Sequence, residues 1–273
     1  MIETHLTPFF GDRWISSIDK AAADDYKAHR LAEGVSNSTV NRERAVLGRI
    51  MTLAFDWGRL RDLPLQRMAK LEEPPALDRF LTHEEADKLI DKAPRHLKPF
   101  IVTALETGGR RSEVLDLKWE DVDLPGGRIW FRKTKSGKSR SVPITPVLGS
   151  VLRSLLKVRP AREDLRDWVF THRGRKMEDV RTAWAVTIEG AELGEDVTVH
   201  TLRHTFASWF IISGGDLYRL QNLLGHHSLK QTERYTHLSQ EYMQSAVSRM
   251  GRGSQRRSQN VVGFSGAPAA ATA

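Results

Sequence analysis

Apolar positions recur at helical spacing over residues 199–212, and this is the clearest pattern in the chain. The repeat follows i, i+4, i+7 and i+8, which places one apolar stripe on an α-helix, formed by Leu202, Phe206, Trp209 and Phe210. A glycine pair ends this helix, and a second helix over residues 217–224 stops at Gly225. The next residue, His226, is therefore expected on a tight turn.

Residues 1–75 have the pattern of a small helical unit. We expect one helix over residues 19–33 and a longer one that is capped by Ser36 or Ser38 and closed by Gly58. The longer helix carries one apolar face, which consists of Val40, Leu47, Ile50, Met51, Ala54 and Phe55. Its arginines lie mostly off that face, so they form either a solvated surface or a surface that binds DNA phosphates.

A linker separates this unit from a second domain over residues 76–250. Residues 72–75 (EEPP) hold two prolines, which cannot continue a helix. Beyond them we expect a capped helix from Thr82, a helix over 97–105, a sheet within 122–144, helices over 147–158 and 180–192, a short buried strand over 167–171, and a final helix over 239–250. Residues 251–273 lack the apolar content of a core and are expected to be disordered. The predicted fold class is mainly α with a small antiparallel β-sheet.

The charge and the cysteine content of the chain favour one kind of partner and exclude several kinds of site. The chain has 273 residues, with 42 Lys and Arg against 34 Asp and Glu, a formal net charge of +8. This charge favours a polyanionic partner such as nucleic acid, although a merely soluble basic protein has the same composition. The absence of cysteine excludes disulfides, thiolate metal ligands and a cysteine nucleophile. Without a membrane-spanning apolar run or a secretion signal, we expect a cytoplasmic protein with no membrane partner.

Two stretches suit the binding of an anion. Residues 107–113 (TGGRRSE) place two glycines before a predicted helix start, where free backbone N–H groups and the helix dipole attract negative charge beside Arg110. Glu113 is expected either to orient a basic side chain or to form a surface ion pair. The turn of the predicted hairpin carries Lys135 and Lys138, which in isolation fit an ordinary soluble loop.

Four residues near the C-terminus suit attack on a phosphodiester: His200, Arg203, His226 and Tyr235. An arginine fork binds nonbridging phosphate oxygens and stabilises the charge of the transition state. A tyrosine hydroxyl can form a covalent link to phosphorus that conserves the energy of the broken bond. A phenol with a pKa near 10 must lose its proton as it attacks, and His200 is the expected base or orienting group. His204 is expected to pack or to hydrogen-bond locally.

These motifs resemble the catalytic domain of the tyrosine recombinases, the phage integrase family. The resemblance rests on HxxR at 200–203, LGH at 224–226 and YTH at 235–237, and on an arginine that follows the Thr-Gly pair by two residues. It covers residues 80–245. At two positions the chain departs from the family pattern: Arg111 and Gly109 stand where apolar residues are usual, and the glycine is expected to loosen the turn.

The resemblance implies a catalytic set of Arg110, Lys135, His200, Arg203, His226 and Tyr235, with Tyr235 as the nucleophile. Lys135 matches the family's hairpin lysine by its distance of eight residues to Pro143, and it would protonate the departing 5′ oxygen. His226 would donate a hydrogen bond to a phosphate oxygen. No cofactor and no metal are implied.

The resemblance also implies a two-domain DNA clamp, in which residues 1–75 form a core-binding domain that is shortened at its N-terminus, either because the chain begins late or because one helix is missing. The implied function is that of a site-specific DNA recombinase that works through a 3′-phosphotyrosyl intermediate, in the integration or excision of a phage or other mobile element. The implied partners are double-stranded DNA with inverted-repeat sites, further copies of the chain in a tetramer, and DNA-bending accessory proteins. Such an enzyme would be associated with the nucleoid.

Three other functions would use part of the same set of residues. A metal-dependent hydrolase would use His200 and His204, which are four residues apart like a zinc pair, but Thr201 stands where a zinc protease has its glutamate base. A catalytically silent DNA-binding protein of the same fold would have no use for the tyrosine. A relaxing topoisomerase would share the chemistry, but it would not need defined inverted sites or a tetramer.

Overall fold

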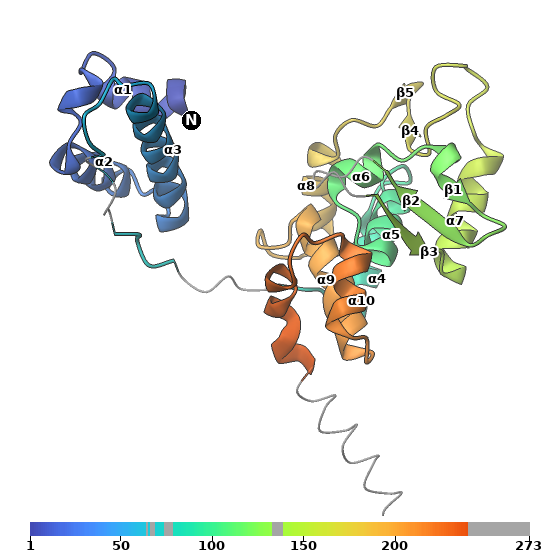
Figure 1. The fold of residues 1–273 in the computed structure, drawn as a ribbon. Coiled ribbons are helices and arrows are strands. Elements are labelled where there is room, and N and C mark those ends of the chain that lie inside the picture. Colours follow the sequence, from blue (N-terminus) through green and yellow to red (C-terminus); the bar gives the residue numbers. More distant parts are fainter. Residues whose placement is uncertain (64, 66–68, 74–78, 133–138, 240–273) are drawn as a thin grey trace, which may run out of the picture. The chain divides into compact units, whose positions relative to one another are not determined.

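The computed structural model divides into two compact units, residues 1–77 and 78–273 (Figure 1). It describes residues 1–239 except 64, 66–68, 74–78 and 133–138. The final helix expected over 239–250 and the tail expected over 251–273 therefore lie outside the described residues, apart from Ser239. None of the described helices is both long and apolar enough to cross a bilayer.

The first unit is helical, as expected. Its elements are η1 (Ile2–Leu6), α1 (Thr7–Phe10), η2 (Ile15–Ser17), α2 (Lys20–Ala32) and α3 (Asn37–Asp56). The side chain of Asp19 caps α2 by accepting a hydrogen bond from a backbone N–H of the first turn. Ser36, not Ser38, caps α3, and Gly58 ends it with φ of 68°. The expected apolar face is buried apart from half-buried Ile50 and from Phe55, which is 41% exposed.

A buried polar network inside the first unit was not predicted from the sequence. Glu43 on α3 has 0% exposure, and its carboxylate accepts hydrogen bonds from Tyr26 and from two nitrogens of Arg30, each at 2.9 Å. Burial alone would raise the pKa of Glu43, but the hydrogen bonds from Arg30 and Tyr26 outweigh it and hold the pKa below its ordinary value. The network therefore joins α2 to α3 through a charged pair and not through apolar packing alone.

Hydrogen bonds hold the start of the predicted linker against α3. The side chain of Asn41 donates to the carbonyl of Leu71 and accepts from its N–H, both at 2.9 Å, and it also donates to Glu73. The two prolines that motivated the linker lie outside the described residues.

The second unit contains helices around two small sheets. Its helices are α4 (His83–Lys92), α5 (Lys98–Thr107), α6 (Arg111–Leu115), η3 (Trp119–Asp121), α7 (Pro146–Lys157), α8 (Arg181–Gly190), α9 (Val199–Ile212), α10 (Leu217–Leu224), η4 (Leu229–Gln231) and η5 (Glu233–Ser239). Its strands are β1 (Val122–Asp123), β2 (Arg128–Phe131), β3 (Arg140–Pro143), β4 (Thr171–His172) and β5 (Arg175–Lys176). The capping box predicted at Thr82 is present, with Glu85 as its acidic partner.

The three-stranded sheet has the order β1-β2-β3 and is antiparallel, which confirms the predicted sheet and the fold class. Its register pairs Phe131 with Arg140 and Ile129 with Val142. The hairpin β4-β5 was not predicted, and the strand expected over 167–171 is wrong. Trp168 makes only an isolated bridge to Lys118, and the strand begins at Thr171.

Helix α5 supplies the centre of the core and packs against α4, α6, α7 and α9 (Figure 1). The stripe predicted for α9 is only partly correct, because Leu202 is fully buried while Phe206, Trp209 and Phe210 are half-buried. Small polar side chains fill part of the buried face instead: Thr205 donates to the backbone of its own helix and accepts from the N–H of Leu81 at 3.0 Å. A threonine is buried there because both hydrogen-bonding roles are satisfied.

A separate apolar cluster forms where α9, α10 and η5 meet. Its buried members are Ala207, Ile211, Leu220, Leu224 and Tyr235. This cluster fixes the short helix η5 against α9 and α10, which are the orange helices of Figure 1. Tyr235 is therefore part of a packed core and not of a loose terminal segment.

Candidate active site

Arg203 ties two helix ends together at the bottom of the site. Its guanidinium is buried, with 3% exposure, and donates to the carbonyl oxygens of Gly108 and Leu224, both at 2.8 Å. These carbonyls belong to the C-terminal ends of α5 and α10, which leave acceptors without a partner inside the helix. Burial, followed by the positive charges of Arg110 and Arg140, lowers the pKa of Arg203 to about 9, so it remains protonated at neutral pH.

The turn between α5 and α6 is tightly packed. Gly108 has φ of 61°, and a Cβ there would lie 2.5 Å from the ring of Phe206. A Cβ on Gly109 would lie 2.7 Å from Val114. The expectation that Gly109 loosens this turn is therefore wrong, because the glycine lets the backbone approach the core closely.

Arg110 follows this turn and is oriented by Glu113. The carboxylate of Glu113 accepts from the backbone N–H of Arg110 at 2.9 Å and from its Nη1 at 2.7 Å. The Arg110 side chain remains 26% exposed, whereas that of Glu113 is 3% exposed. Of the two roles left open for Glu113, the structure therefore selects that of an internal orienting group.

Glu113 also pairs with Arg140, a residue that the sequence did not single out. Nη2 of Arg140 donates to Glu113 at 2.7 Å, its Nε donates to the carbonyl of Leu223 at 2.7 Å, and its guanidinium lies over the ring of Phe131. Burial would raise the pKa of Glu113, but the hydrogen bond and the charge of Arg140, followed by the hydrogen bonds from Arg110, lower it to about 2. Glu113 is thus ionised throughout the physiological range.

A signal for Arg140 was present in the strand pattern. Alternate residues of a strand face the same side, so Arg140 shares the inward face of β3 with Val142, and both are buried. An arginine at an inward position requires a buried partner, so the strand alternation indicates a buried acceptor for Arg140 without indicating which residue supplies it.

Tyr235 presents its hydroxyl to the interior of the site. The residue is 2% exposed, and its hydroxyl lies 2.6 Å from Nδ1 of His204. The local packing expected for His204 is present against the ring of His200, but its hydrogen bond is not local, because it joins α9 to η5 across 31 residues of sequence. The negative charge of an ionised Tyr235 would raise the pKa of Arg203, which places the tyrosine within electrostatic range of the guanidinium.

His226 occupies the tight turn that the sequence predicted after α10. Gly225 adopts φ of 65°, and the following imidazole Nδ1 lies 2.8 Å from the hydroxyl of Thr232. Burial, and then the charges of Arg203, Arg110 and Arg140, lower the pKa of His226 to about 4. The histidine is therefore neutral at physiological pH in the free protein.

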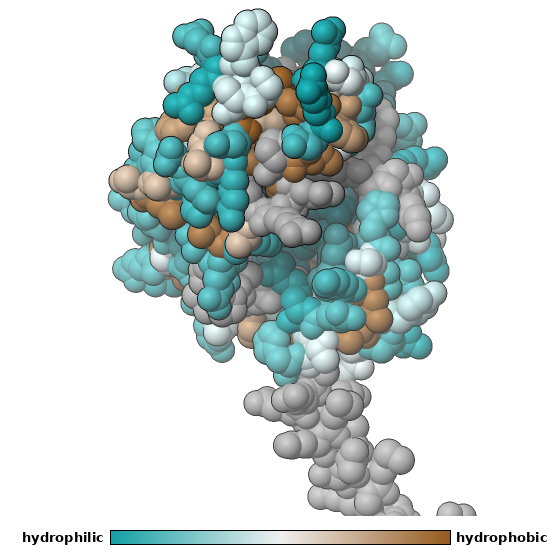
Figure 2. Space-filling model, turned by 60° about the vertical axis from the view of Figure 1, so that its left-hand side comes forward, coloured by the Kyte–Doolittle hydropathy of each residue, from teal (hydrophilic) through white to brown (hydrophobic). Residues whose placement is uncertain are grey.

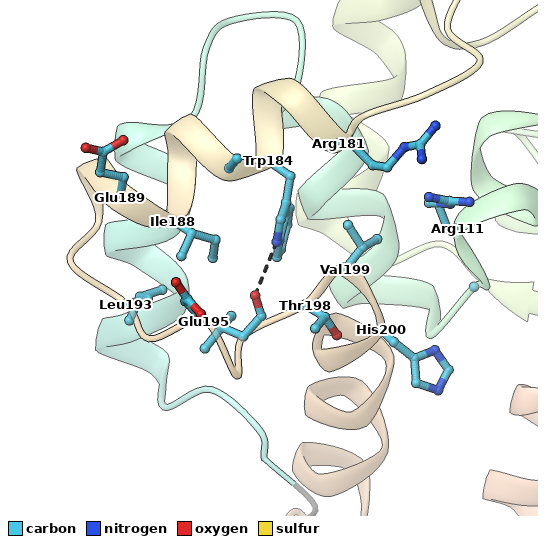
Figure 3. Close-up of a pocket in the computed structure, with 13 residues that line it drawn as sticks. Arg111, Arg181, Trp184, Ile188, Glu189, Leu193, Glu195, Thr198, Val199 and His200 are labelled. Atoms are coloured by element: carbon cyan, nitrogen blue, oxygen red, sulfur yellow. Dashed lines mark hydrogen bonds between the residues drawn. The ribbon is translucent and has the colours of Figure 1, made fainter. Parts of the chain in front are cut away.

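His200 stands at the first turn of α9, on the rim of a cavity of about 880 Å³ that α8, the start of α6 and the segment before α9 enclose (Figure 3). Trp184 forms part of the wall and donates to the carbonyl of Val197 at 3.2 Å. Arg111 and Arg181 lie near each other at the same side of the mouth (Figure 3). Partial burial, and then Arg203, Arg234 and Arg110, lower the pKa of His200.

The zinc geometry considered for His200 and His204 is not formed. Their rings meet edge to face at 4.7 Å, and Nδ1 of His204 is engaged by Tyr235. Among the described residues, no group of three or more histidine and acidic side chains is placed to hold a metal ion.

Five of the six residues singled out from the sequence come together in one site: Arg110, His200, Arg203, His226 and Tyr235. The sixth, Lys135, lies outside the described residues, as does Lys138. Arg110 and Arg140 both bind the one buried carboxylate of Glu113, and Arg203 is held by backbone carbonyls. The site therefore carries excess positive charge beside the neutral His226. Such a site suits a phosphate, because guanidinium groups bind its oxygens and a tyrosine hydroxyl lies among them.

One face of the chain has a mainly polar surface. On the face drawn in Figure 2, hydrophilic side chains predominate, and the hydrophobic ones form separate patches. Together with the formal charge of +8, this surface fits a polyanion better than an apolar partner.

Comparison with known proteins shows the family of this chain. A model of the phage integrase family matches residues 79–242. Tyrosine recombinase XerA of Thermococcus kodakarensis is 31% identical over 240 residues, which cover 85% of this chain and 82% of that protein. The integrase of Escherichia phage P2 is 27% identical over 252 residues, which cover 89% of this chain and 68% of that protein.

A solved structure has the same fold. The Tn1549 transposon integrase in complex with a circular intermediate DNA superposes with a TM-score of 0.74 at 20% identity, covering 85% of this chain and 86% of that one. The family model spans more than half of the chain, and the chain belongs to the phage integrase family and is a tyrosine recombinase.

Proposed function

We propose that this chain cleaves and rejoins DNA by forming a 3′-phosphotyrosyl link at Tyr235. The observation that carries the proposal is the buried hydroxyl of Tyr235 in the same site as Arg203 and the excess positive charge. Attack by the phenolic oxygen on a bound phosphate stores the energy of the broken bond, and a 5′-hydroxyl then restores the DNA backbone. Such a reaction consumes no nucleotide.

Each candidate residue has a role that follows from its chemistry. Arg110 and Arg203 bind nonbridging oxygens and stabilise the transition state, with Glu113 setting the angle of Arg110. Neutral His226 donates a hydrogen bond to a phosphate oxygen, and His200 orients the phosphate or the attacking group. Lys135, on the sequence match alone, protonates the departing 5′ oxygen.

Charge and kinship support a DNA partner. XerH, a site-specific recombinase with a similar fold, has been solved bound to a palindromic DNA substrate, with 22% identity and a TM-score of 0.73. For this chain we propose double-stranded DNA with inverted-repeat sites, on which protomers assemble as a tetramer with accessory bending proteins. Residues 1–75 serve as the core-binding domain, and residues 239–250 pack on a neighbouring protomer.

The proposed biological role is integration or excision of a phage or another mobile element. The kinship to phage integrases supports it. The enzyme then works on the nucleoid, in the cytoplasm of its host, because its substrate lies there. A silent DNA-binding protein is disfavoured by the buried, hydrogen-bonded Tyr235, which phosphate binding alone does not require.

The test is a covalent adduct. DNA fragments that flank the gene, nicked near inverted repeats, are incubated with the wild-type protein and with Tyr235→Phe, and a denaturant-resistant complex is mapped by peptide mass. An adduct on Tyr235 that is lost in the Phe variant supports the proposal. Specific binding without any adduct would favour the silent binder instead.

A further inference from the structure

The hydroxyl of Tyr235 and the imidazole of His204 are joined at 2.6 Å, between the oxygen and Nδ1. This distance is short for a hydrogen bond between a hydroxyl and a nitrogen. Tyr235 is 2% exposed and packs in the apolar cluster of α9, α10 and η5, while His204 is half-buried. The contact therefore occurs at the very atom that attacks phosphorus in the proposed reaction.

The position of His204 on α9 couples it to the phosphate-binding side of the site. It follows Arg203, whose guanidinium is held by the carbonyls of Gly108 and Leu224 at 2.8 Å. One turn of α9 therefore carries both the guanidinium of Arg203, which would bind the phosphate, and the imidazole of His204, which contacts the hydroxyl of Tyr235. The ring of His200 braces that of His204 edge to face at 4.7 Å.

We infer that His204 is the catalytic base that accepts the phenolic proton of Tyr235 as the tyrosine attacks. This inference rests on the proposed function. In the forward step, the bond from the phenolic oxygen to phosphorus forms and the bond from phosphorus to the 5′ oxygen breaks. The phenolic proton passes to Nδ1 of His204, and the 5′ oxygen takes a proton from Lys135. In the rejoining step, the 5′-hydroxyl returns its proton to Lys135 as its oxygen bonds to phosphorus. The bond from phosphorus to the phenolic oxygen breaks, and imidazolium at His204 returns its proton to the departing tyrosine.

The surroundings of Tyr235 and His204 favour the transfer of the phenolic proton. A phenol with a pKa near 10 is a poor nucleophile until its proton leaves, and a positioned base within hydrogen-bond reach meets the geometric requirement for removing it. Tyr235 is already in electrostatic range of Arg203, so negative charge that develops on the oxygen is stabilised by a fixed cation. His200 was the base expected from the sequence, but the 2.6 Å contact assigns this role to the histidine one turn further along.

The first test reads the protonation of His204 in the free wild-type protein. Long-range nitrogen–proton spectra of histidine-labelled protein distinguish the two imidazole tautomers, and His204→Gln identifies the resonance. We expect the proton on Nε2, with Nδ1 accepting from Tyr235 and shifting in Tyr235→Phe. A proton resident on Nδ1 would overturn the inference, because that nitrogen would then donate to the tyrosine and could not take its proton.

The second test measures single-turnover adduct formation on the nicked duplex from the gene's flanking DNA, with the full chain. We expect His204→Ala to slow the reaction by about 100-fold or more while DNA binding persists, and added imidazole to restore part of the rate. His172→Gln, on β4, is the matched control and should react at the wild-type rate. Thermal unfolding of both variants verifies that they are folded.

A duplex with a 5′-bridging sulfur at the cleavage site distinguishes the loss of the catalytic base from the loss of the catalytic acid. Its thiolate leaves without a proton, but Tyr235 must still lose one, so His204→Ala should remain slow on this duplex. Recovery of His204→Ala on the sulfur duplex, or a rate within about threefold of wild type on ordinary DNA, would overturn the assignment. Absence of a Tyr235 adduct with the wild-type protein would instead refute the proposed function itself.

Discussion

Arg140 and Glu113 form a buried ion pair in which Nη2 lies 2.7 Å from the carboxylate, with side-chain exposures of 5% and 3%. Through it, strand β3 is fixed to the start of α6, and because Glu113 also binds Arg110, the pair sets the position of a proposed phosphate ligand. Nε of Arg140 extends the connection to the carbonyl of Leu223 at the end of α10. Three segments of the site are thus joined through this ion pair: β3, the start of α6 and the end of α10.

Removal of the negative charge of Glu113 should destabilise the fold. In Glu113→Gln the amide keeps the shape of the side chain, but it leaves the guanidinium of Arg140 buried without a counter-charge. We expect the free energy of unfolding, measured by urea denaturation, to fall by about 3–5 kcal/mol. Glu163→Gln, at a side chain that is 90% exposed, is the matched control and should change stability little. Equal stability of the two variants would contradict a structural role for the pair.

Acid should destabilise the protein in two windows. His226 has a pKa of about 4 in the fold against an ordinary value of 6.5, so between these pH values only the unfolded chain gains a proton, and stability falls as pH falls. Glu113 has a pKa of about 2 against 4.5, so its stabilising contribution is present above pH 4.5 and is lost toward pH 2.

The first window can be isolated by mutation. His226→Gln should flatten the loss of stability between pH 6.5 and 4, whereas His227→Gln, at an exposed histidine, should leave it unchanged. Urea denaturation at a series of pH values measures the slope, and histidine NMR gives the pKa directly. A pKa near 6.5 for His226 in the free protein would contradict the burial and the arginine charges that we describe.

Gly108 should be irreplaceable for two separable reasons. Its φ of 61° strains any other residue, and a Cβ would lie 2.5 Å from Phe206 and 2.8 Å from Leu224. Gly127 has a similar φ of 65° but open space around it, so Gly127→Ala isolates the backbone strain, about 1–2 kcal/mol. We expect Gly108→Ala to reduce the free energy of unfolding by more than Gly127→Ala does, and to displace the carbonyl that binds Arg203. Similar losses of unfolding free energy in the two variants would show that the side chains of Phe206 and Leu224 move aside to accept the new Cβ.

The rim of the cavity beside His200 should bind the DNA backbone. Arg111 and Arg181 have side chains that are 52% and 82% exposed, and both pair with Asp179. If each contacts a phosphate, its replacement by Ala should weaken binding equally for specific and nonspecific DNA. The slope of log affinity against log salt should fall by about 0.9 per contact. Arg175→Ala, at an exposed arginine of β5, is the control, and an unchanged slope for Arg111→Ala and Arg181→Ala would place the DNA elsewhere.

The sequence predicted those features whose signals are local. Helices α3, α9 and α10 have apolar periodicity with capping residues and terminal glycines, so their existence and their limits could be derived. The tight turn at His226 followed from Gly225 alone, and the candidate site residues followed from short motifs at fixed spacing. Each of these inferences depends on residues that are near one another in the chain.

The features that the sequence did not predict depend on pairing at long range. Glu113 meets Arg140 across 27 residues, and His204 meets Tyr235 across 31. Which basic side chain reaches the carboxylate is decided by the strand register that pairs Arg140 with Phe131. Whether His200 or His204 reaches the tyrosine is decided by how η5 packs on α9, and spacing on one helix cannot distinguish them.

Lys135 provides the last prediction, which rests on its distance of eight residues from Pro143 and not on a described contact. If Lys135 protonates the departing 5′ oxygen, Lys135→Ala should bind DNA normally but form the Tyr235 adduct about 100-fold more slowly or worse. A 5′-bridging sulfur should restore the rate, because a thiolate leaves without a proton. Lys138→Ala, three residues along the same segment, is the matched control. If the sulfur duplex rescued Lys138→Ala and not Lys135→Ala, Lys138 would be the proton donor. If it rescued neither variant, the proton donor would lie outside this segment.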